Sequence, residues 1–237
     1  MTNELPISKL LYNIETDSVI VNEHADLVRH MASLTKLMTA LVVIESGMLI
    51  TKKLQLVEPL LETVEHTKNK LPIGESFSVH RLLTYLLISS NNAAAQTLAE
   101  NYPGGYEKFL EAMNDKARKI GMTNTIFTDG SGSEKGNMST AQDAQILTAE
   151  ALKNRTIRDI YHASKSIKDI LRTTTLIENT VNNIHIIKGG QSSEHSLNIC
   201  FAFNKKYIAV IMGSELLTMV RICKEFQNLV ADKNLSV

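Results

Sequence analysis

Residues 196–212 read SLNICFAFNKKYIAVIM and hold two consecutive runs of branched and aromatic residues, Ser196–Phe203 and Tyr207–Met212. The polar triplet Asn204-Lys205-Lys206 separates these runs and has the composition of a turn. A third run of the same kind, Ile184–Lys188, precedes the pair. Short runs of this composition, bounded by turn residues, predict β-strands, and the triplet predicts a hairpin. The last third of the chain is therefore expected to form strands of a sheet.

The opening of the chain has a similar pattern, because Leu10–Ile14 and Ser18–Val21 flank the turn residues Glu15-Thr16-Asp17. Most of the sequence between the two ends has apolar residues at helical spacing, with capping residues at the expected ends. We expect a helix that begins at Asn91 or Asn92 and runs to Glu100. Further helices are expected over residues 33–45, 79–88, 106–120, 140–152 and 215–230.

Strands at both ends with helices between them predict an α/β fold of the α+β kind. The expected architecture is one antiparallel sheet flanked by helices, with a mostly helical subdomain inserted. We expect a single domain over residues 1–237, in which 1–38 and 155–237 form the sheet-containing region and 39–154 the helical region. The 237 residues, 26.3 kDa in mass, are enough for one large core.

Composition excludes several classes of function. The 25 basic and 25 acidic residues balance, whereas a nucleic-acid-binding protein normally carries a clustered basic excess. No apolar run approaches the roughly 18 residues needed to span a bilayer. Only Cys200 and Cys223 are present, so no disulfide framework holds the fold together. These two residues could form one bridge, but we expect two buried thiols.

Ser33-Leu34-Thr35-Lys36 is the one Ser-x-x-Lys segment of the sequence and lies at the start of an expected helix. Residues three apart share a helix face, so the Ser33 hydroxyl and the Lys36 amine can meet. A partly desolvated lysine has a lowered pKa and can take the serine proton, and the helix N-terminus favours developing negative charge. The alternative interpretation is a helix cap followed by a solvated lysine.

Two further segments could complete a catalytic site. Residues 89–93 (SSNNA) fall in a short break between two expected helices, where a hydroxyl and an amide can face a substrate. Both Ser89 with Asn91 and Ser90 with Asn92 fit a Ser-x-Asn pattern, and a pure capping role is the alternative. Lys188-Gly189-Gly190 ends a β-prone run, where a cation beside small residues can neutralise a substrate carboxylate. Taken alone, this segment is also an ordinary strand end.

Residues 31–40 (MASLTKLMTA) resemble the ASLTKLMTA segment of serine D-alanyl-D-alanine carboxypeptidases, the low-molecular-mass penicillin-binding proteins. The motif set of that family, Ser-x-x-Lys, Ser-x-Asn and Lys-Thr-Gly, is shared with class A β-lactamases. The resemblance extends over roughly residues 8–230 and implies a β-lactamase/transpeptidase-like fold. Other segments similar to recurring family stretches are Tyr12–Asp26, Leu71–Val79, Gly121–Phe127 and Ser139–Asp143.

The resemblance also implies roles for individual residues. Ser33 would be the acylated nucleophile and Lys36 its general base. The family segment SGNDA falls on residues 89–93 and selects Ser89 and Asn91 over the other register. Lys188 would be the lysine of the third motif. The substrate-binding residues implied are Gly189, Gly190, Gln191, Ser192 and Arg221; the backbone N–H groups of Ser33 and Gln191 would form the oxyanion hole.

One departure from the family pattern bears on activity. The third motif is Lys188-Gly189-Gly190, so the threonine hydroxyl that would bind the terminal carboxylate of the substrate is absent. The loss of one such charge-assisted hydrogen bond costs ~1.5–3 kcal/mol. Ser192 could compensate for it. Activity that is weak, retargeted or lost is therefore an open alternative.

The function expected from the resemblance is removal of the terminal D-Ala from peptidoglycan stem peptides, through an acyl-enzyme on Ser33. Endopeptidase cleavage of cross-links uses the same machinery, and a catalytically impaired peptidoglycan-binding or penicillin-binding domain is the non-enzymatic alternative. Expected partners are the stem peptide and β-lactam antibiotics, which would be covalent inhibitors. No metal is expected, since the seven histidines are scattered. No cofactor and no nucleic acid are expected either.

Fast release of a bound penicillin would require a dedicated carboxylate, which class A β-lactamases supply from a Glu-x-x-x-Asn motif. Glu150 with Asn154 and Glu178 with Asn182 have this spacing by chance, because both lie well beyond the place that such enzymes use. We therefore expect a long-lived penicilloyl-enzyme.

The cellular location follows from the resemblance and not from a leader. Residues 1–6 have neither a basic segment nor an apolar one, so no signal peptide is visible. From the residues alone, the protein is either cytoplasmic or its sequence begins after a removed leader. A cell-wall substrate implies the second alternative, and we expect an extracytoplasmic location, in the periplasm or at the cell surface.

Overall fold

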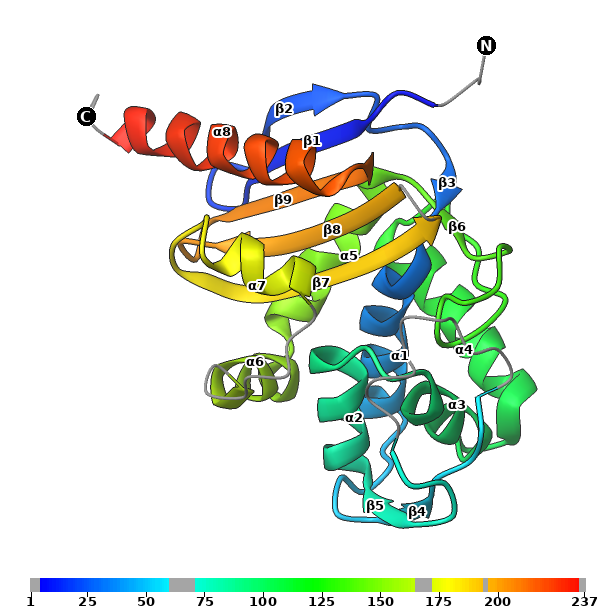
Figure 1. Ribbon diagram of the computed structural model, residues 1–237. Coiled ribbons are helices and arrows are strands. Elements are labelled where there is room, and N and C mark those ends of the chain that lie inside the picture. Colours follow the sequence, from blue (N-terminus) through cyan, green and yellow to red (C-terminus); the bar gives the residue numbers. More distant parts are fainter. Residues whose placement is uncertain (1–4, 60–70, 165–171, 194–195, 235–237) are drawn as a thin grey trace.

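The centre of the molecule is a five-stranded antiparallel sheet in the order β2-β1-β9-β8-β7 (Figure 1). The computed structural model describes residues 5–59, 71–164, 172–193 and 196–234. The sheet confirms the predicted fold class, because strands from both ends of the chain form it. Its strands are β1 (Ser8–Asn13), β2 (Ser18–Glu23), β7 (Ile184–Ser193), β8 (Ser196–Phe203) and β9 (Tyr207–Ser214).

The two expected hairpins join through β1 and β9. Leu10 pairs with Val210 in this register, and both side chains are buried. The β8–β9 turn contains Asn204 and Lys205, whose φ angles of 50° and 62° are left-handed, as in the tight turns of twisted hairpins. Strand β7 lies at one edge of the sheet and runs on to Ser193, five residues beyond the expected end at Lys188. This extension carries residues 189–192 along the edge strand.

Helices cover both faces of the sheet, which explains why β8 and β9 are apolar along nearly their whole length. Helix α5 (Ala141–Lys153) packs against β1, β8 and β9. Helix α8 (Leu216–Asn234) packs against β9 from the other face, in front of the sheet in Figure 1. Two short helices accompany β7: α6 (Arg155–Ala163) and α7 (Arg172–Glu178).

The remaining helices surround α1 (Thr35–Glu45), which begins directly after the short 3₁₀ helix η1 (Ala32–Leu34). Helix α1 contacts α5 and three further helices, α2 (Val79–Ile88), α3 (Asn92–Glu100) and α4 (Gly105–Ile120). Every residue of α1 from Thr35 to Val43 is buried. The short strands are β3 (Arg29–His30), β4 (Lys53–Gln55), β5 (Ser76–Ser78) and β6 (Met138–Ser139).

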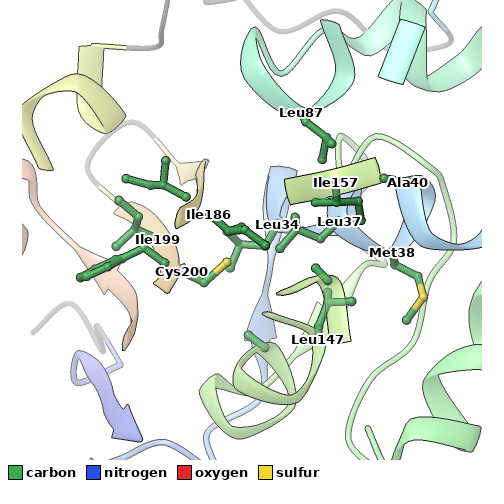
Figure 2. Packing of buried hydrophobic residues seen from close by; sticks show 14 of the residues in the cluster. Leu34, Leu37, Met38, Ala40, Leu87, Leu147, Ile157, Ile186, Ile199 and Cys200 are labelled. Atoms are coloured by element: carbon green, nitrogen blue, oxygen red, sulfur yellow. The ribbon is translucent and has the colours of Figure 1, made fainter. Parts of the chain in front are cut away.

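One hydrophobic core joins the sheet to the helices (Figure 2). Five fully buried members of it are Leu34 of η1, Leu37 of α1, Leu147 of α5, and Ile186 and Ile199 of the sheet. The first turn of α1 is therefore fixed between the sheet and the helical layer. The division into a sheet-containing region and an inserted helical region stays a proposal, since α5, at the end of the second, also packs on the sheet.

The helix positions agree closely with the predictions, whereas several short elements were not predicted. Each helix expected from the sequence is present, with ends shifted by at most four residues, at the C-terminus of α8. Helices α6 and α7 and the two-stranded pairs β3–β6 and β4–β5 were not expected. These elements have nine residues or fewer, too short for a periodic pattern to be distinctive. Cys200 and Cys223 are buried free thiols, as predicted.

Among the residues that the structure describes, no helix combines the length and the apolar character needed to cross a bilayer.

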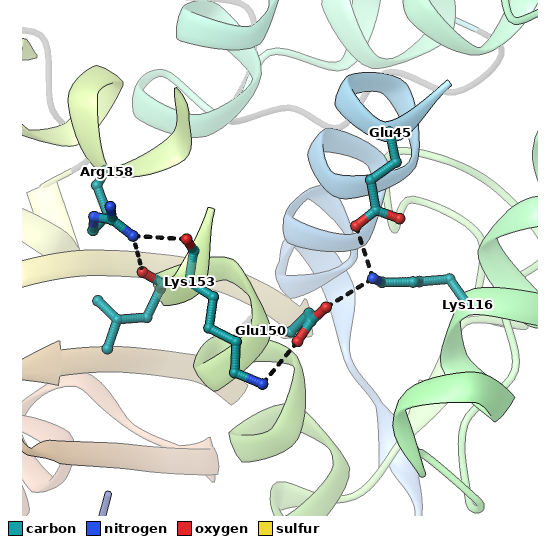
Figure 3. Close-up of polar contacts among 6 residues, drawn as sticks. Glu45, Lys116, Glu150, Lys153 and Arg158 are labelled. Carbon is teal, nitrogen blue, oxygen red and sulfur yellow. Dashed lines mark hydrogen bonds and ion pairs between the residues drawn. The ribbon is translucent and has the colours of Figure 1, made fainter. Parts of the chain in front are cut away.

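A small cluster of ion pairs links the helices α1, α4 and α5 (Figure 3). The Lys116 ammonium of α4 donates hydrogen bonds to Glu45 of α1 (2.7 Å) and to Glu150 of α5 (2.8 Å). Lys153 donates a third bond to Glu150 (3.1 Å). The hydrogen bonds to Glu150 lower its pKa below the usual value, and the bond from Lys116 has the largest effect. Glu150 therefore has a structural role, which agrees with the interpretation of its spacing to Asn154 as chance.

We predict that Lys116→Met lowers the free energy of unfolding by about 1 kcal/mol at pH 7, because two carboxylates lose their common cation. A carboxyl with a lowered folded-state pKa stabilises the protein above the unfolded pKa of about 4.3 and loses this contribution as the pH falls. The difference from wild type should therefore shrink below about pH 4. Urea unfolding at several pH values measures it.

Lys153→Met is the matched control, because the Lys153 side chain is 76% exposed against 11% for Lys116. We expect it to change stability by less than about 0.5 kcal/mol. Equal effects of the two substitutions, or a Lys116 effect unchanged at pH 3, would contradict the prediction.

Candidate active site

Ser33 and Lys36 form the centre of the site. The turn from η1 into α1 places the Lys36 Nζ atom 2.8 Å from the Ser33 Oγ atom, to which it donates a hydrogen bond. Lys36 is fully buried, while Ser33 keeps part of its surface exposed. The structure thus brings together the hydroxyl and the amine of the Ser-x-x-Lys segment, and it excludes the alternative of a solvated lysine.

The surroundings of Lys36 favour its neutral form. Burial lowers the pKa of Lys36 well below its ordinary value, and the nearby Lys188 ammonium lowers it further, while the Asp129 carboxylate opposes both effects. A neutral amine can accept a proton along the same 2.8 Å contact to Ser33 Oγ. The local chemistry is therefore that of a serine beside a buried base.

A loop that the sequence did not single out for function orients Lys36. The Ser131 backbone carbonyl accepts a 2.6 Å hydrogen bond from Lys36 Nζ. Asp129 fixes this loop by accepting bonds from the backbone N–H groups of Ser131, Gly132 and Glu134 and from the Ser131 hydroxyl. A Cβ atom on Gly132 would overlap the Ala32 carbonyl, so the loop lies directly against η1. Its composition of Gly, Ser and Asp is typical of any loop.

The structure corrects the register of the second motif. Ser90, which is 1% exposed, accepts a 2.8 Å hydrogen bond from Lys188 Nζ, and Ser89, the residue expected from the resemblance, is not its partner there. Asn91 is the N-cap of α3, where its side-chain oxygen accepts from the Ala94 N–H (2.8 Å). The side-chain amide of Asn92 instead donates to the Ser133 hydroxyl (3.1 Å), and Asn92 lines a small pocket together with Gln96 and Ser131.

A local backbone feature explains this register. Ser90 has a left-handed φ of 53°, which turns the chain sharply between α2 and α3. Left-handed conformations of residues other than Gly are strained and concentrate at functional sites. An asparagine directly before an alanine-rich helix caps it with its own side chain. This capping preference was the signal in the sequence that favoured Ser90 with Asn92.

Lys188 approaches the site from the edge strand β7. Its ammonium is 1% exposed and also donates to the Gly189 carbonyl (2.7 Å). Burial lowers the pKa of Lys188 to about 7. Lys188 interacts electrostatically with Lys36, the amine that contacts the Ser33 hydroxyl, so Lys188 is the cationic group of the pair. The site therefore attracts a negative charge, such as that of a carboxylate or an oxyanion.

Gly190 lets the edge strand β7 approach η1 closely. A Cβ atom on Gly190 would lie 2.8 Å from the Ser33 backbone nitrogen and 3.1 Å from the Ala32 Cβ. Any larger residue would therefore push β7 away from η1. The following residue, Gln191, is half-buried on the same edge strand, and its backbone N–H stays the expected second donor of an oxyanion hole.

Two of the expected substrate-binding side chains have other partners. The Ser192 hydroxyl donates to the Ser196 carbonyl (3.0 Å) and contacts the Ser196 hydroxyl (2.9 Å) across the β7–β8 end. Arg221 lies on α8, which packs on β9, two strands away from β7. Its side chain is 72% exposed and pairs with Glu225. The structure therefore does not bring Arg221 to the site, because its position on α8 points it into solvent.

The part of the chain that the structure describes contains no group of three or more His, Cys, Asp or Glu side chains able to hold a metal ion. Cys200 is opposite Lys188 in the β7–β8 register, and burial raises the pKa of its thiol to about 11. The chemistry assembled around Ser33 is that of hydroxyls, amines and backbone donors.

Comparison with known proteins agrees with this chemistry. Residues 7–215 match the family of D-alanyl-D-alanine carboxypeptidases, peptidase family S11. The chain belongs to this family, a family of serine peptidases that includes penicillin-binding proteins.

Curated relatives carry two activities in their names. A D-alanyl-D-alanine endopeptidase of Pseudomonas aeruginosa is 31% identical over 218 residues, which are 86% of this chain and 70% of the relative. An Escherichia coli protein of the same name is 34% identical over 136 residues, 57% of this chain and 44% of the relative. The D-alanyl-D-alanine carboxypeptidase DacF of Bacillus subtilis is 31% identical over 175 residues, 71% and 43% respectively. The chain thus spans less than half of the length of two of these three relatives.

Solved structures confirm the β-lactamase/transpeptidase-like fold. The Streptomyces K15 DD-transpeptidase superposes with a TM-score of 0.74 at 21% identity, over 97% of each chain. Penicillin-binding protein D2 of Listeria monocytogenes, in its ampicillin-bound form, has a TM-score of 0.76 at 23% identity, over 94% of this chain and 96% of the other.

We predict that Ser90→Gly lowers the rate of Ser33 acylation by roughly 10²–10⁴-fold, because it removes the hydroxyl that contacts Lys188. This variant is a strict test of the register. It turns residues 89–91 into the Ser-Gly-Asn of the family segment, which would be fully active if Ser89 and Asn91 were the working pair. Glycine also adopts the left-handed φ without strain, so the fold is preserved.

Ser89→Ala is the matched control and should stay within about twofold of wild type, since Ser89 is one residue away from the Lys188 contact. Stopped-flow or gel-based acylation with a fluorescent penicillin measures both variants. Loss of acylation in Ser89→Ala with a normal rate in Ser90→Gly would restore the register expected from the sequence.

Proposed function

We propose that the protein is a serine DD-peptidase that removes the terminal D-Ala from peptidoglycan stem peptides through an acyl-enzyme on Ser33. The observation that carries this proposal is the contact of Ser33 with the buried amine of Lys36, bordered by the Ser90–Lys188 pair. Membership of the peptidase family S11 supports the same substrate class.

The first chemical step would be attack of Ser33 Oγ on the carbonyl carbon of the penultimate D-Ala. Lys36, neutral before the reaction, would take the hydroxyl proton along the 2.8 Å contact. The oxygen of the tetrahedral intermediate would lie between the backbone N–H groups of Ser33 and Gln191. One such donor typically contributes about 2.7–4 kcal/mol to transition-state stabilisation.

Breakdown of the intermediate requires a proton for the departing amino group of D-Ala. Ser90 can pass this proton on, because its hydroxyl contacts Lys188 Nζ. Water then hydrolyses the ester on Ser33 and returns the free hydroxyl. Asn92, which shares a pocket with Ser131, would hold the peptide backbone of the stem.

The identity of the leaving group distinguishes two activities within this family. Endopeptidase cleavage of a cross-link between stems follows the same steps with a longer leaving group. Relatives named endopeptidase, including one that aligns over 86% of this chain, support this second candidate. Both activities act on the cell wall, and we therefore place the protein outside the cytoplasmic membrane, with β-lactams as covalent inhibitors.

We predict that the second-order rate constant for acylation follows a bell-shaped pH profile. The rate should rise with pH as Lys36 loses its proton, at a pH well below the ordinary lysine pKa of about 10.4. It should fall as the pH passes about 7, because Lys188 then loses the charge that attracts a carboxylate. Acylation rates between pH 5 and 10 measure both limbs.

Lys188→Arg tests the assignment of the falling limb. Arginine stays charged at all of these pH values, so the limb should disappear even though the absolute rate is lower. A wild-type rate that keeps rising to pH 10 would contradict the lowered pKa of Lys188.

We predict that incubation with penicillin adds the mass of one penicilloyl group to the wild-type protein and none to Ser33→Ala. The adduct should persist for minutes or longer, because Glu150 and Glu178, the two residues with the spacing of a deacylating base, lie well beyond the place that β-lactamases use, and Glu150 is also bonded to Lys116 and Lys153. Intact-mass spectrometry follows both formation and loss. Release within seconds would contradict the proposed peptidase in favour of a β-lactamase.

The two candidate activities are distinguished by incubating the same preparation with a peptide ending in D-Ala-D-Ala and with a cross-linked dimer. The products show which of the two substrates is cleaved. Acylation by penicillin without turnover of either peptide would instead indicate a penicillin-binding domain that has lost its hydrolytic activity.

A further inference from the structure

The side-chain amide of Asn137 joins the loop at Ser131 to the first turn of α1. Asn137 is 0% exposed and directly precedes β6. Its side-chain oxygen accepts hydrogen bonds from the backbone N–H groups of Thr128 (2.6 Å) and Asp129 (3.1 Å). Its side-chain nitrogen donates to the Thr35 hydroxyl (3.1 Å) and to the Asp129 carboxylate (3.2 Å). A buried amide with partners on two segments fixes these segments relative to each other, because a shift would leave buried polar groups unpaired.

The backbone of Asn137 is bonded to the segment that leads to the nucleophile. Strand β6 pairs with β3, with Met138 opposite His30. The Asn137 carbonyl accepts a 3.0 Å hydrogen bond from the backbone N–H of Met31, two residues before Ser33. The short pair β3–β6 therefore keeps Asn137 beside the turn that carries Ser33.

One set of contacts runs from Asn137 through Thr35 to the residue before Ser33. The Thr35 hydroxyl accepts the hydrogen bond from Asn137 and donates its own to the Ala32 carbonyl (2.7 Å). Ala32 has a left-handed φ of 51°. A residue with a side chain keeps such a strained conformation only where its surroundings fix it. The contact from Thr35 is one of the restraints that hold Ala32 in place.

The peptide group between Ala32 and Ser33 has its two polar ends on different sides. A Cβ atom on Gly132 of the loop would overlap the Ala32 carbonyl, whereas one on Gly190 of β7 would lie 2.8 Å from the Ser33 nitrogen. The C=O and N–H of a planar trans peptide point in opposite directions. A hydrogen bond that holds the carbonyl on the loop side therefore turns the Ser33 N–H toward β7. This strand carries Gln191, the other expected donor of the oxyanion hole.

A second set of contacts runs from Asn137 to the base. The Asp129 carboxylate, which accepts from Asn137, also accepts from the backbone N–H of Ser131 (2.5 Å). The Ser131 carbonyl in turn accepts the 2.6 Å bond from Lys36 Nζ. Asn137 and Thr35 are both 0% exposed, so neither can touch a substrate. Any effect of these two residues on the reaction must act through the groups that they hold.

We propose that Asn137 is a positioning residue for the acylation of Ser33. Its amide holds the Thr35 hydroxyl against the Ala32 carbonyl, and this contact aims the N–H of the same peptide group into the expected oxyanion hole. The inference rests on the proposed function, because it assigns a role in the same acyl transfer. An oxyanion donor acts on charge that develops in the transition state. Loss of its alignment should therefore lower the rate of acylation without weakening the non-covalent binding of penicillin.

Thr35→Val tests the middle of this set of contacts, because it keeps a branched side chain and removes the hydroxyl. It should lower the limiting rate constant for acylation by a fluorescent penicillin by roughly 10- to 100-fold. The dissociation constant of the non-covalent complex should stay within about twofold of wild type. Thr35→Ser keeps the hydroxyl and should retain most of the rate. Stopped-flow measurements over a range of penicillin concentrations give both constants.

Thr148→Val is the matched control. Thr148 is 0% exposed, like Thr35, and its hydroxyl also donates to a backbone carbonyl at 2.7 Å, that of Ala144 on α5. The control should acylate within about twofold of the wild-type rate. An equal loss of rate in Thr35→Val and Thr148→Val would indicate a general loss of stability and would overturn the positioning role. Thermal unfolding of each variant checks its fold.

Asn137→Ala tests the other end of the contacts, alone and combined with Thr35→Val. If both residues act through one contact, the double variant should acylate within about twofold of Asn137→Ala alone. Effects that multiply would show that Thr35 works without Asn137 and would contradict the proposal. Where Asn137→Ala fails to fold, Asn137→Ser, which retains a short polar side chain, gives the same comparison.

Failure of this inference and failure of the proposed function give different results. Wild-type protein that forms no penicilloyl adduct on Ser33 would overturn both. Acylation of Thr35→Val or of folded Asn137→Ala at the wild-type rate would overturn the positioning role alone. A wild type that is acylated but hydrolyses no D-Ala-D-Ala peptide, with variants that acylate slowly, would overturn the proposed hydrolysis and support the role of Asn137.

Discussion

The burial of two lysine side chains, Lys36 and Lys188, is the constraint on which the rest of the site depends. An ammonium group removed from water is costly unless it loses its proton or finds partners. The structure uses both solutions: hydroxyl and carbonyl acceptors surround each amine, and the pKa of each is lowered. Those acceptors come from η1, the loop at Ser131, the α2–α3 break and β7. The same contacts therefore hold four distant segments together, and the burial of Lys36 favours its neutral, basic form.

Small residues and strained residues determine how closely these segments approach. Gly190 lets the edge strand reach the Ser33 backbone nitrogen, and Gly132 lets the loop reach the Ala32 carbonyl. Ala32 and Ser90 have left-handed φ angles of 51° and 53° at the two points where the chain enters the site. Such strain is maintained only where the surrounding packing fixes the backbone, and here the buried first turn of α1 provides that packing.

The sequence was informative where a pattern is long or chemically distinctive. The periodicity of α1 to α5, the β-prone runs at both ends and the Ser33–Lys36 spacing predicted the fold and the centre of the site. The predicted register of the second motif was wrong for a local reason. Two registers fit residues 89–93, and only the capping of α3 by Asn91 distinguishes them. Ser131 was not predicted, because it acts through its backbone carbonyl. Contacts of this kind depend on tertiary packing, which no short pattern encodes.

The pairing of β1 with β9 has a consequence for how the chain folds. Leu10 finds Val210 as its partner, so the sheet stays incomplete until nearly the whole polypeptide is available. Contacts so distant in sequence slow folding, because a long loop must close before they form. Until then β1 and its neighbour β2 form an isolated hairpin, which is marginally stable in water. Assembly of the sheet is thus a late event, and the two ends of the chain control it jointly.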